Sequence, residues 1–145
     1  MSKLKYRAVV TGATRGIGFS IAERLINDGM EVIVTGTKEK SSYPDGAIYR
    51  SVDFLNDESV KKFIIFFKEQ KIDILINNAG INKIGEFALI DIEDFDQILR
   101  VNLRTPFQLC QAVIPNMQQN NWGRIVNLTS IFGNITKEYR APYSS

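Results

Sequence analysis

The feature that most constrains the fold is a glycine-rich stretch, TGATRGIG at residues 11–18, which directly follows an apolar run. That run, residues 6–11, is rich in β-branched side chains and predicts a strand buried on both faces. Helical spacing starts at Ile17, and Gly29 stands where a C-terminal cap is expected. A glycine turn between a strand and a helix lets the backbone approach a diphosphate, whose charge the helix N-terminus favours. The stretch therefore predicts a dinucleotide-binding turn.

The rest of the chain alternates short apolar runs with amphipathic stretches. The apolar runs predict further strands at residues 31–35, 47–53, 72–76 and 125–130. A helix is predicted after a cap at Asn56 and Asp57, and its stripe of Val60, Phe63, Ile64 and Phe67 is assigned to packing rather than to a cofactor site. Alternation of this kind predicts the α/β class, a doubly wound parallel sheet.

A second long helix is predicted from about Asp91, with interruptions, to about Met117. Its apolar residues occupy two faces. One stripe holds Leu99, Leu103, Phe107, Cys110 and Ile114, and the other holds Leu109, Ala112 and Val113. We expect such a helix to pack on the sheet and on a second subunit, so the chain is predicted to form a homo-oligomer.

Composition narrows the function by excluding several classes. The 145 residues, 44% of them hydrophobic, suit a single domain spanning residues 1–145. The absence of His excludes a Ser-His-Asp hydrolase and most zinc sites, and a single cysteine excludes an internal disulfide. A net charge of +2 without a basic cluster predicts neither a nucleic-acid nor a membrane partner. With a polar start and no apolar leader, we expect a cytoplasmic protein.

The glycines are spaced G-x-x-x-G-x-G rather than G-x-G-x-x-G, and this spacing resembles the signature of the short-chain dehydrogenase/reductase family. Residues 77–80, NNAG, resemble the element of that family that borders the cofactor. Within the family, the chain resembles the 3-oxoacyl-ACP reductase-like members. The resemblance implies a Rossmann fold in which Asp53 bonds the adenine amino group. It implies further cofactor contacts from Gly12, Thr14, Arg15, Gly16, Ile17, Gly18, Asn78, Ala79 and Gly80.

The same resemblance implies a catalytic set. Tyr143 follows Ser130 by thirteen positions, which matches the family's spacing, and Asn102 lies mid-helix between two apolar residues. Family members transfer hydride between a nicotinamide and a carbonyl or alcohol, so a small carbonyl or alcohol substrate is expected. By resemblance, Tyr143 is the general acid, Ser130 polarises the carbonyl oxygen and Asn102 orders a relay water. In this class, the carboxyl ends of the strands form the ligand site.

The residues after the second strand indicate which dinucleotide binds. Gly36 stands where NAD-preferring members carry an acid for the ribose 2′-hydroxyl. Thr37, Lys38 and Arg15 suit a 2′-phosphate, so NADP(H) is favoured over NAD(H). A shift of a few positions in the turn would instead bring Glu39 to the ribose and favour NAD(H).

The family places a Lys four residues after the Tyr, where its charge lowers the phenol pKa. That position is 147, and the sequence stops at Ser145. We therefore expect a truncated form whose sheet ends after the fifth strand, which binds dinucleotide weakly and turns over poorly. Its exposed fifth strand is expected to promote association. The alternative is a non-catalytic dinucleotide-binding module or a decayed remnant. A relative of the sugar-nucleotide epimerases is disfavoured, because that branch uses another glycine spacing.

Overall fold

The computed structural model describes residues 6–135 and 137–144. Within them, one parallel sheet has the strand order β3-β2-β1-β4-β5. Its strands are β1 (Arg7–Val10), β2 (Glu31–Gly36), β3 (Ile48–Ser51), β4 (Ile74–Asn77) and β5 (Arg124–Asn127). The chain builds outward from β1 to β3, then returns across β1 to add β4 and β5. This order confirms the predicted α/β fold, a doubly wound parallel sheet.

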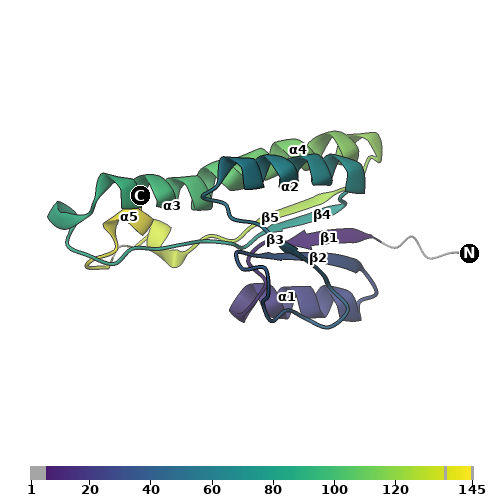
Figure 1. Cartoon of the computed structure of the whole chain (residues 1–145), viewed down its shortest axis with the longest axis horizontal. Helices are drawn as coiled ribbons and strands as arrows, with labels where there is room; N and C mark the ends of the chain where they lie inside the picture. The colour runs from purple at the N-terminus through teal and green to yellow at the C-terminus, as the bar shows by residue number, and fades with distance from the viewer. Residues whose placement is uncertain (1–5, 136, 145) are drawn as a thin grey trace, which may run out of the picture.

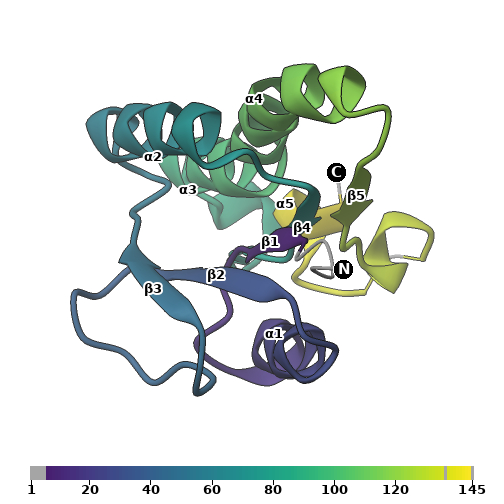
Figure 2. The same cartoon turned by 90° about the vertical axis from the view of Figure 1, so that its right-hand side faces the viewer.

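Helices cover both faces of the sheet, with α1 on one face and α2 and α4 on the other (Figures 1 and 2). Short α3 and α5 lie at the end toward which the strands point (Figure 1). The helices are α1 (Gly16–Asn27), α2 (Asp57–Gln70), α3 (Ile92–Leu99), α4 (Thr105–Gln119) and α5 (Ala141–Ser144). Two 3₁₀ turns, η1 (Phe87–Leu89) and η3 (Ile131–Gly133), and a π-helical turn, η2 (Arg100–Arg104), complete the described elements.

Strand residues alternate between two hydrophobic cores. On β1, Val9 faces the core under α2 and α4, whereas Ala8 and Val10 face the core under α1. The first core holds large side chains, including Phe63 and Phe67, whose ring centroids lie 4.5 Å apart. Because both faces of β1 are buried after Arg7, the next residues Ala8, Val9 and Val10 are all apolar rather than alternating with polar ones.

Capping residues bound the helices as the sequence predicts. Asn56 accepts a hydrogen bond from the Ser59 amide at the start of α2, and Asp91 accepts one from the Glu93 amide at the start of α3. At the end of α1, the amide of Gly29 donates to the Ile26 carbonyl, and the next amide reaches back to Leu25. This pair is a Schellman motif, so the predicted glycine cap is confirmed.

The long helix predicted between residues 91 and 117 is two α-helices joined by the π-helical turn η2. The residues that α4 and η2 bury are spaced by four, namely Val101, Thr105, Leu109, Val113 and Met117. Leu103 and Phe107 are 65% and 61% exposed, and they line one groove with Leu99, so these three members of the predicted stripe share a face that lies outside the core. Packing of this stripe on a second subunit stays a prediction.

Two strands, β3 and β5, end at least two residues earlier than predicted. β3 ends at Ser51, so Asp53 lies beyond the strand, where its carboxylate accepts a hydrogen bond from the Leu55 amide. β5 ends at Asn127, so Ser130 lies not at the strand end but at the start of η3. In both places a side chain caps a turn of its own segment, and such local bonds compete with the sheet ladder.

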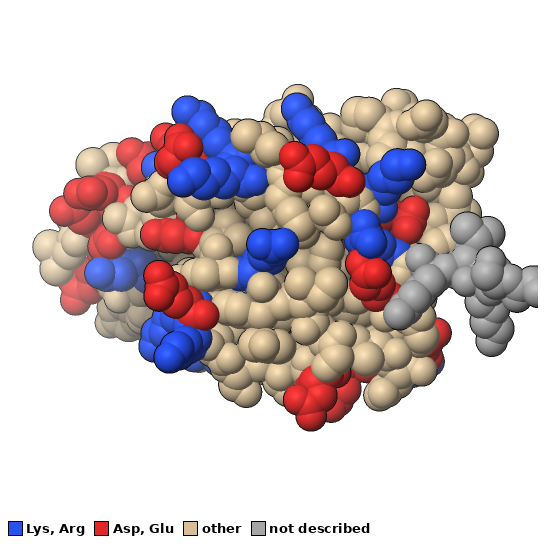
Figure 3. Space-filling view, turned by 45° about the vertical axis from the view of Figure 1, so that its right-hand side comes forward, with Lys and Arg blue, Asp and Glu red and all other residues tan. Residues whose placement is uncertain are grey.

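The surface carries charges of both signs. On the face drawn in Figure 3, basic and acidic side chains are interspersed among uncharged ones. A helix of the length and apolarity needed to cross a bilayer is not found within residues 6–135 and 137–144.

Candidate functional site

The glycine-rich turn connects β1 to α1 and lies directly against the segment that follows β4. Gly12 adopts a φ of +66°, and a Cβ there would come within 2.8 Å of the Ala79 Cα atom. A Cβ on Gly18 would come within 2.4 Å of the Asn78 amide nitrogen. Only glycine fits this contact, because the opposing atoms belong to another backbone segment or to a side chain fixed by hydrogen bonds.

Those hydrogen bonds centre on Thr11 and Asn78. The Thr11 hydroxyl oxygen accepts from the backbone amides of Asn78 and Ala79, both at 3.0 Å. In return, the Asn78 side-chain amide donates to the carbonyls of Thr11 and Gly12, at 2.9 and 3.0 Å. The Thr35 hydroxyl, at the end of β2, accepts from the Gly12 amide at 3.1 Å. The turn is therefore held by β2 and β4 independently of any ligand.

The first turn of α1 leaves its backbone amides available. Its N-cap residue, Arg15, makes no capping hydrogen bond with its side chain, and no acidic residue lies in the first helical turn. Gly16 has a φ of +58°, and a Cβ there would meet no atom within 4 Å. Free amides, a positive helix terminus and open space above the backbone fit a bound diphosphate.

A cleft of about 780 Å³ lies along this turn at the carboxyl ends of the strands. All the residues predicted to bind the cofactor line it: Gly12, Thr14, Arg15, Gly16, Ile17, Gly18, Thr37, Lys38, Asp53, Asn78, Ala79 and Gly80. The predicted catalytic residues Asn102, Ser130 and Tyr143 are not among its lining residues. Gly36, considered above for the choice of dinucleotide, also lines it. Sequence reasoning missed several others: Lys40, Ser41, Ser42, Phe54, Leu55, Ile81 and Val101. Their ordinary loop and apolar contexts gave no signal.

The cleft is lined by three basic side chains and by one carboxylate, that of Asp53. Arg15, Lys38 and Lys40 are exposed there, and none of them belongs to an ion pair recorded among the described residues. Glu39 does not line the cleft. Cations without a carboxylate partner favour the binding of an anion in the cleft.

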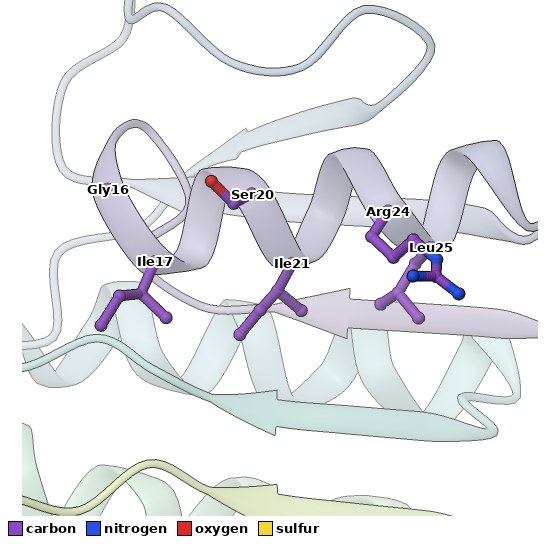
Figure 4. A pocket seen from close by; sticks show the side chains of 6 residues that line it. All are labelled: Gly16, Ile17, Ser20, Ile21, Arg24 and Leu25. Atoms are coloured by element: carbon purple, nitrogen blue, oxygen red, sulfur yellow. The ribbon is translucent and has the colours of Figure 1, made fainter.

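A shallower groove of about 600 Å³ runs along α1 and shares Gly16 and Ile17 with the cleft. Figure 4 shows Ile17, Ile21 and Leu25 projecting from the same side of α1. Ile21 and Leu25 pack against the core under this helix, whereas Ile17 is 67% exposed. The groove is mainly apolar and carries no cluster of titratable groups, so we assign no chemistry to it.

Asn102 lies within the π-helical turn η2, where the helix geometry changes. Its side-chain oxygen accepts from the Ile81 amide, and its side-chain nitrogen donates to the Ile81 carbonyl, both at 2.9 Å. π-turns occur often at functional sites. Here the turn presents Asn102 to the residue that follows the NNAG element, so the side chain anchors the loop that borders the cleft.

Ser130 and Tyr143 lie on neighbouring short turns. The Ser130 hydroxyl accepts from the Phe132 amide at 3.2 Å and caps η3. The Tyr143 ring, on α5, meets the Phe132 ring edge-on at 6.4 Å between centroids. The guanidinium of Arg140 lies 5.2 Å from the centroid of the same Phe132 ring. Phe132 thus connects the two predicted catalytic segments.

Cys110 is a poor candidate for a nucleophile. Burial raises the pKa of its thiol, although a contact with the Asn77 side-chain amide partly opposes this. The same amide donates to the Asn127 side chain at 2.8 Å and so ties β4 to β5. A thiol with a raised pKa stays protonated at neutral pH, and a protonated thiol is unreactive.

Comparison with known proteins identifies the family. The model of the short chain dehydrogenase family matches residues 6–145. The chain belongs to this family. It is 37% identical over 138 residues to the 3-oxoacyl-[acyl-carrier-protein] reductase FabG of Aquifex aeolicus, covering 87% of this chain and 56% of that protein. It is 28% identical over 149 residues to the D-beta-hydroxybutyrate dehydrogenase of Rhizobium meliloti, covering 94% and 58%.

A solved structure of a short-chain dehydrogenase from Streptomyces avermitilis superposes with a TM-score of 0.88, at 28% identity, and covers 99% of this chain. This chain covers 56% of that one. The chain thus spans little more than half the length of the relatives it matches. The family is that of oxidoreductases, and members of this kind use a nicotinamide dinucleotide.

Proposed function

We propose that this short-chain dehydrogenase binds NADP(H) in the cleft and transfers hydride between the nicotinamide and a carbonyl or alcohol substrate. The observation that carries the proposal is the convergence of three strand ends on one cleft. The turn after β1, the loop after β2 and the NNAG element after β4 all line it. In doubly wound sheets the ligand binds at this edge.

The fit of the cleft to a dinucleotide rests on its own residues. The amides of the first α1 turn would hold the diphosphate, since neither a capping side chain nor an acidic residue competes for them. Asp53 would contact the adenine. Asn78 would keep the glycine turn in place while the ligand binds. When bound, the nicotinamide supplies the hydride chemistry.

The preference for a 2′-phosphate is supported by charge and by space. Arg15, Lys38 and Lys40 line the cleft and form no ion pair with a carboxylate within residues 6–135 and 137–144. A Cβ on Gly36 would lie 2.5 Å from the Thr14 methyl carbon, so an acidic side chain there requires Thr14 to move. Glu39, the acid nearest in sequence, does not line the cleft.

In the proposed reaction, Tyr143 gives a proton to the substrate oxygen and Ser130 donates a hydrogen bond to the same oxygen. The Ser130 hydroxyl proton is free for this purpose, because the recorded bond uses its oxygen as an acceptor. Asn102 would support a relay water from within η2. The names of the relatives suggest 3-oxoacyl thioesters and 3-hydroxy acids as the substrates to test first.

Fluorescence titration of the full chain with NADPH and NADH tests the cofactor proposal. We expect tighter binding of NADPH, and tighter binding of NADH would overturn the preference. Binding of neither dinucleotide would overturn the function itself. The control is Lys61→Ala, which removes an exposed lysine on α2 that does not line the cleft and leaves both affinities unchanged.

The second candidate is a dinucleotide-binding module without catalysis. One observation favours it: the cleft does not reach Asn102, Ser130 or Tyr143 in the described residues. The reading frame after codon 145 discriminates the two. A Lys at position 147, followed by further sequence, favours the enzyme, whereas a stop codon favours the module. Turnover of a 3-oxoacyl thioester with NADPH, measured on the full-length product, decides the question directly.

A further inference from the structure

The loop that carries the lysines, residues 37–42, is exposed on most of its length and follows β2. Its backbone is nevertheless tied to β3, the neighbouring strand. The Thr37 carbonyl accepts a hydrogen bond from the Ser51 hydroxyl at 3.2 Å. The Lys38 carbonyl accepts one from the Tyr49 hydroxyl, which also lies 3.2 Å from the Ser41 hydroxyl oxygen. Two side chains on β3 therefore set the course of this loop.

Tyr49 is itself held in place. It pairs with Val34 in the register of β2 and β3, and it is half-buried. Its ring stacks on the Tyr43 ring, with centroids 5.0 Å apart and planes 9° from parallel. Because strand pairing and ring stacking both restrain Tyr49, its hydroxyl has a defined position beside the loop of residues 37–42.

The same hydroxyl also fills the space beside Gly36. A Cβ on Gly36 would come within 2.8 Å of the Tyr49 hydroxyl oxygen. Tyr49 therefore bears on the binding of both dinucleotides, NADP(H) and NAD(H). It fixes the segment from Lys38 to Ser41, and it crowds the position from which an acid would bind a ribose 2′-hydroxyl.

We propose that Tyr49 is a positioning residue that sets the preference for a 2′-phosphorylated dinucleotide. Its hydroxyl holds the Lys38 backbone before the ligand arrives, so less conformational entropy is lost when the lysine side chains close on a phosphate. A ligand without the 2′-phosphate gains nothing from this ordering. The inference rests on the proposed NADP(H) function and names the residue behind its selectivity.

The test compares Tyr49→Phe with Tyr43→Phe in the full chain. Both substitutions remove one hydroxyl and keep the stacked ring, but no hydrogen bond recorded among the described residues uses the Tyr43 hydroxyl. We expect Tyr49→Phe to weaken NADPH binding about 3- to 10-fold, the range of one hydrogen bond, and to change NADH binding less than about 2-fold. Tyr43→Phe should change neither affinity.

The outcomes separate this inference from the function on which it rests. Wild-type protein that binds no dinucleotide, or prefers NADH, contradicts the proposed function. A second outcome contradicts only the role of Tyr49. In it, the wild-type protein prefers NADPH, but Tyr49→Phe leaves the ratio of NADPH to NADH affinity unchanged because it weakens both ligands equally or neither. Equal losses would indicate a merely structural effect.

Two further variants keep the proposal testable. If circular dichroism shows that Tyr49→Phe does not fold, Ser41→Ala decides, because it removes only the partner hydroxyl. A lower NADPH-to-NADH selectivity supports the proposal, and an unchanged selectivity contradicts it. A double-mutant cycle with Lys38→Ala locates the effect: Tyr49→Phe should cost clearly less NADPH affinity in that background, and additive losses would contradict action through Lys38.

Discussion

The glycine-rich turn and the segment from Ser130 to Ser144 belong to the same candidate site, but they are stabilised differently. The turn is held by residues far along the sequence, Thr35 at the end of β2 and Asn78 after β4. The later segment is held mostly by local bonds, such as Phe132 amide to Ser130 and Tyr143 amide to the Arg140 carbonyl. The sheet therefore fixes the first region, whereas short turns fix the second.

One long-range backbone bond joins the second region to the rest of the site. The Gly85 amide, in the segment between β4 and α3, donates to the Tyr139 carbonyl at 3.1 Å. Asn102 stands between the two regions, since it anchors Ile81 at the start of the same segment. Because long-range bonds hold the glycine-rich turn, we expect substitutions there to lower the stability of the fold and the affinity for the dinucleotide together. Because mostly local bonds hold the segment from Ser130 to Ser144, we expect substitutions near Ser130 to act mainly on catalysis.

Gly12→Ala gives the largest expected effect. A φ of +66° costs an L-residue about 1–2 kcal/mol, and the contact of its Cβ with the Ala79 Cα adds an overpacking cost of about 1–3 kcal/mol. We expect the free energy of unfolding to fall by about 2–5 kcal/mol, and NADPH affinity to fall more than about 10-fold as the turn shifts. Urea denaturation and fluorescence titration measure the two.

The matched control is Gly29→Ala. This glycine has a φ of +86° at the end of α1, but a Cβ there would meet no atom within 4 Å. Only the conformational cost of about 1–2 kcal/mol applies, and NADPH affinity should not change. If both variants lost the same stability and the same affinity, the contact between the turn and the NNAG element would not be what holds the site.

Much of the first region could be predicted from the sequence, because its signals are local. The glycines, the preceding strand and the following helix stand together in residues 6–29, and all of the predicted cofactor residues line the cleft. Their binding of a cofactor stays a prediction. The partners that hold the turn were not predicted: Thr11, for example, bonds residues 67 and 68 positions away.

The π-helical turn around Asn102 was the main obstacle to prediction elsewhere. The apolar spacing predicted a helix with interruptions from about Asp91 to Met117, but it carried no signal for the wider turn at Arg100–Arg104. The role of Tyr49 was hidden for another reason. A tyrosine in a short strand is ordinary, and only the fold places its hydroxyl under Lys38.

Asn102→Ala is the second test and probes the link between the two regions. It leaves both the amide and the carbonyl of Ile81 without their recorded partner, so we expect a loss of about 1–3 kcal/mol in the free energy of unfolding. Because Ile81 lines the cleft, NADPH affinity should also fall, by about 3- to 10-fold for a displaced contact.

Asn116→Ala is its control on α4. The Asn116 side chain donates to the Ile72 carbonyl at 3.1 Å, away from the cleft. We expect Asn116→Ala to lower the free energy of unfolding by about 0.5–1.5 kcal/mol and to leave NADPH affinity unchanged. An Asn102→Ala variant that lost stability but bound NADPH normally would show that this anchor supports the fold and not the cleft.

Ser130→Ala is expected to have the smallest effect on stability. It removes one cap from a three-residue turn, so the free energy of unfolding should fall by less than about 1 kcal/mol, and NADPH affinity should be unchanged because Ser130 does not line the cleft. Turnover of a 3-oxoacyl thioester by the full-length protein should fall by about 10²- to 10³-fold, the effect of removing one donor to a developing oxyanion.

The control is Thr129→Ala, at the exposed neighbouring position, which should change neither the free energy of unfolding, nor NADPH affinity, nor turnover. Equal turnover in the two variants would remove Ser130 from the catalytic set, and a large loss of stability in Ser130→Ala would show that the second region is not held by local bonds alone.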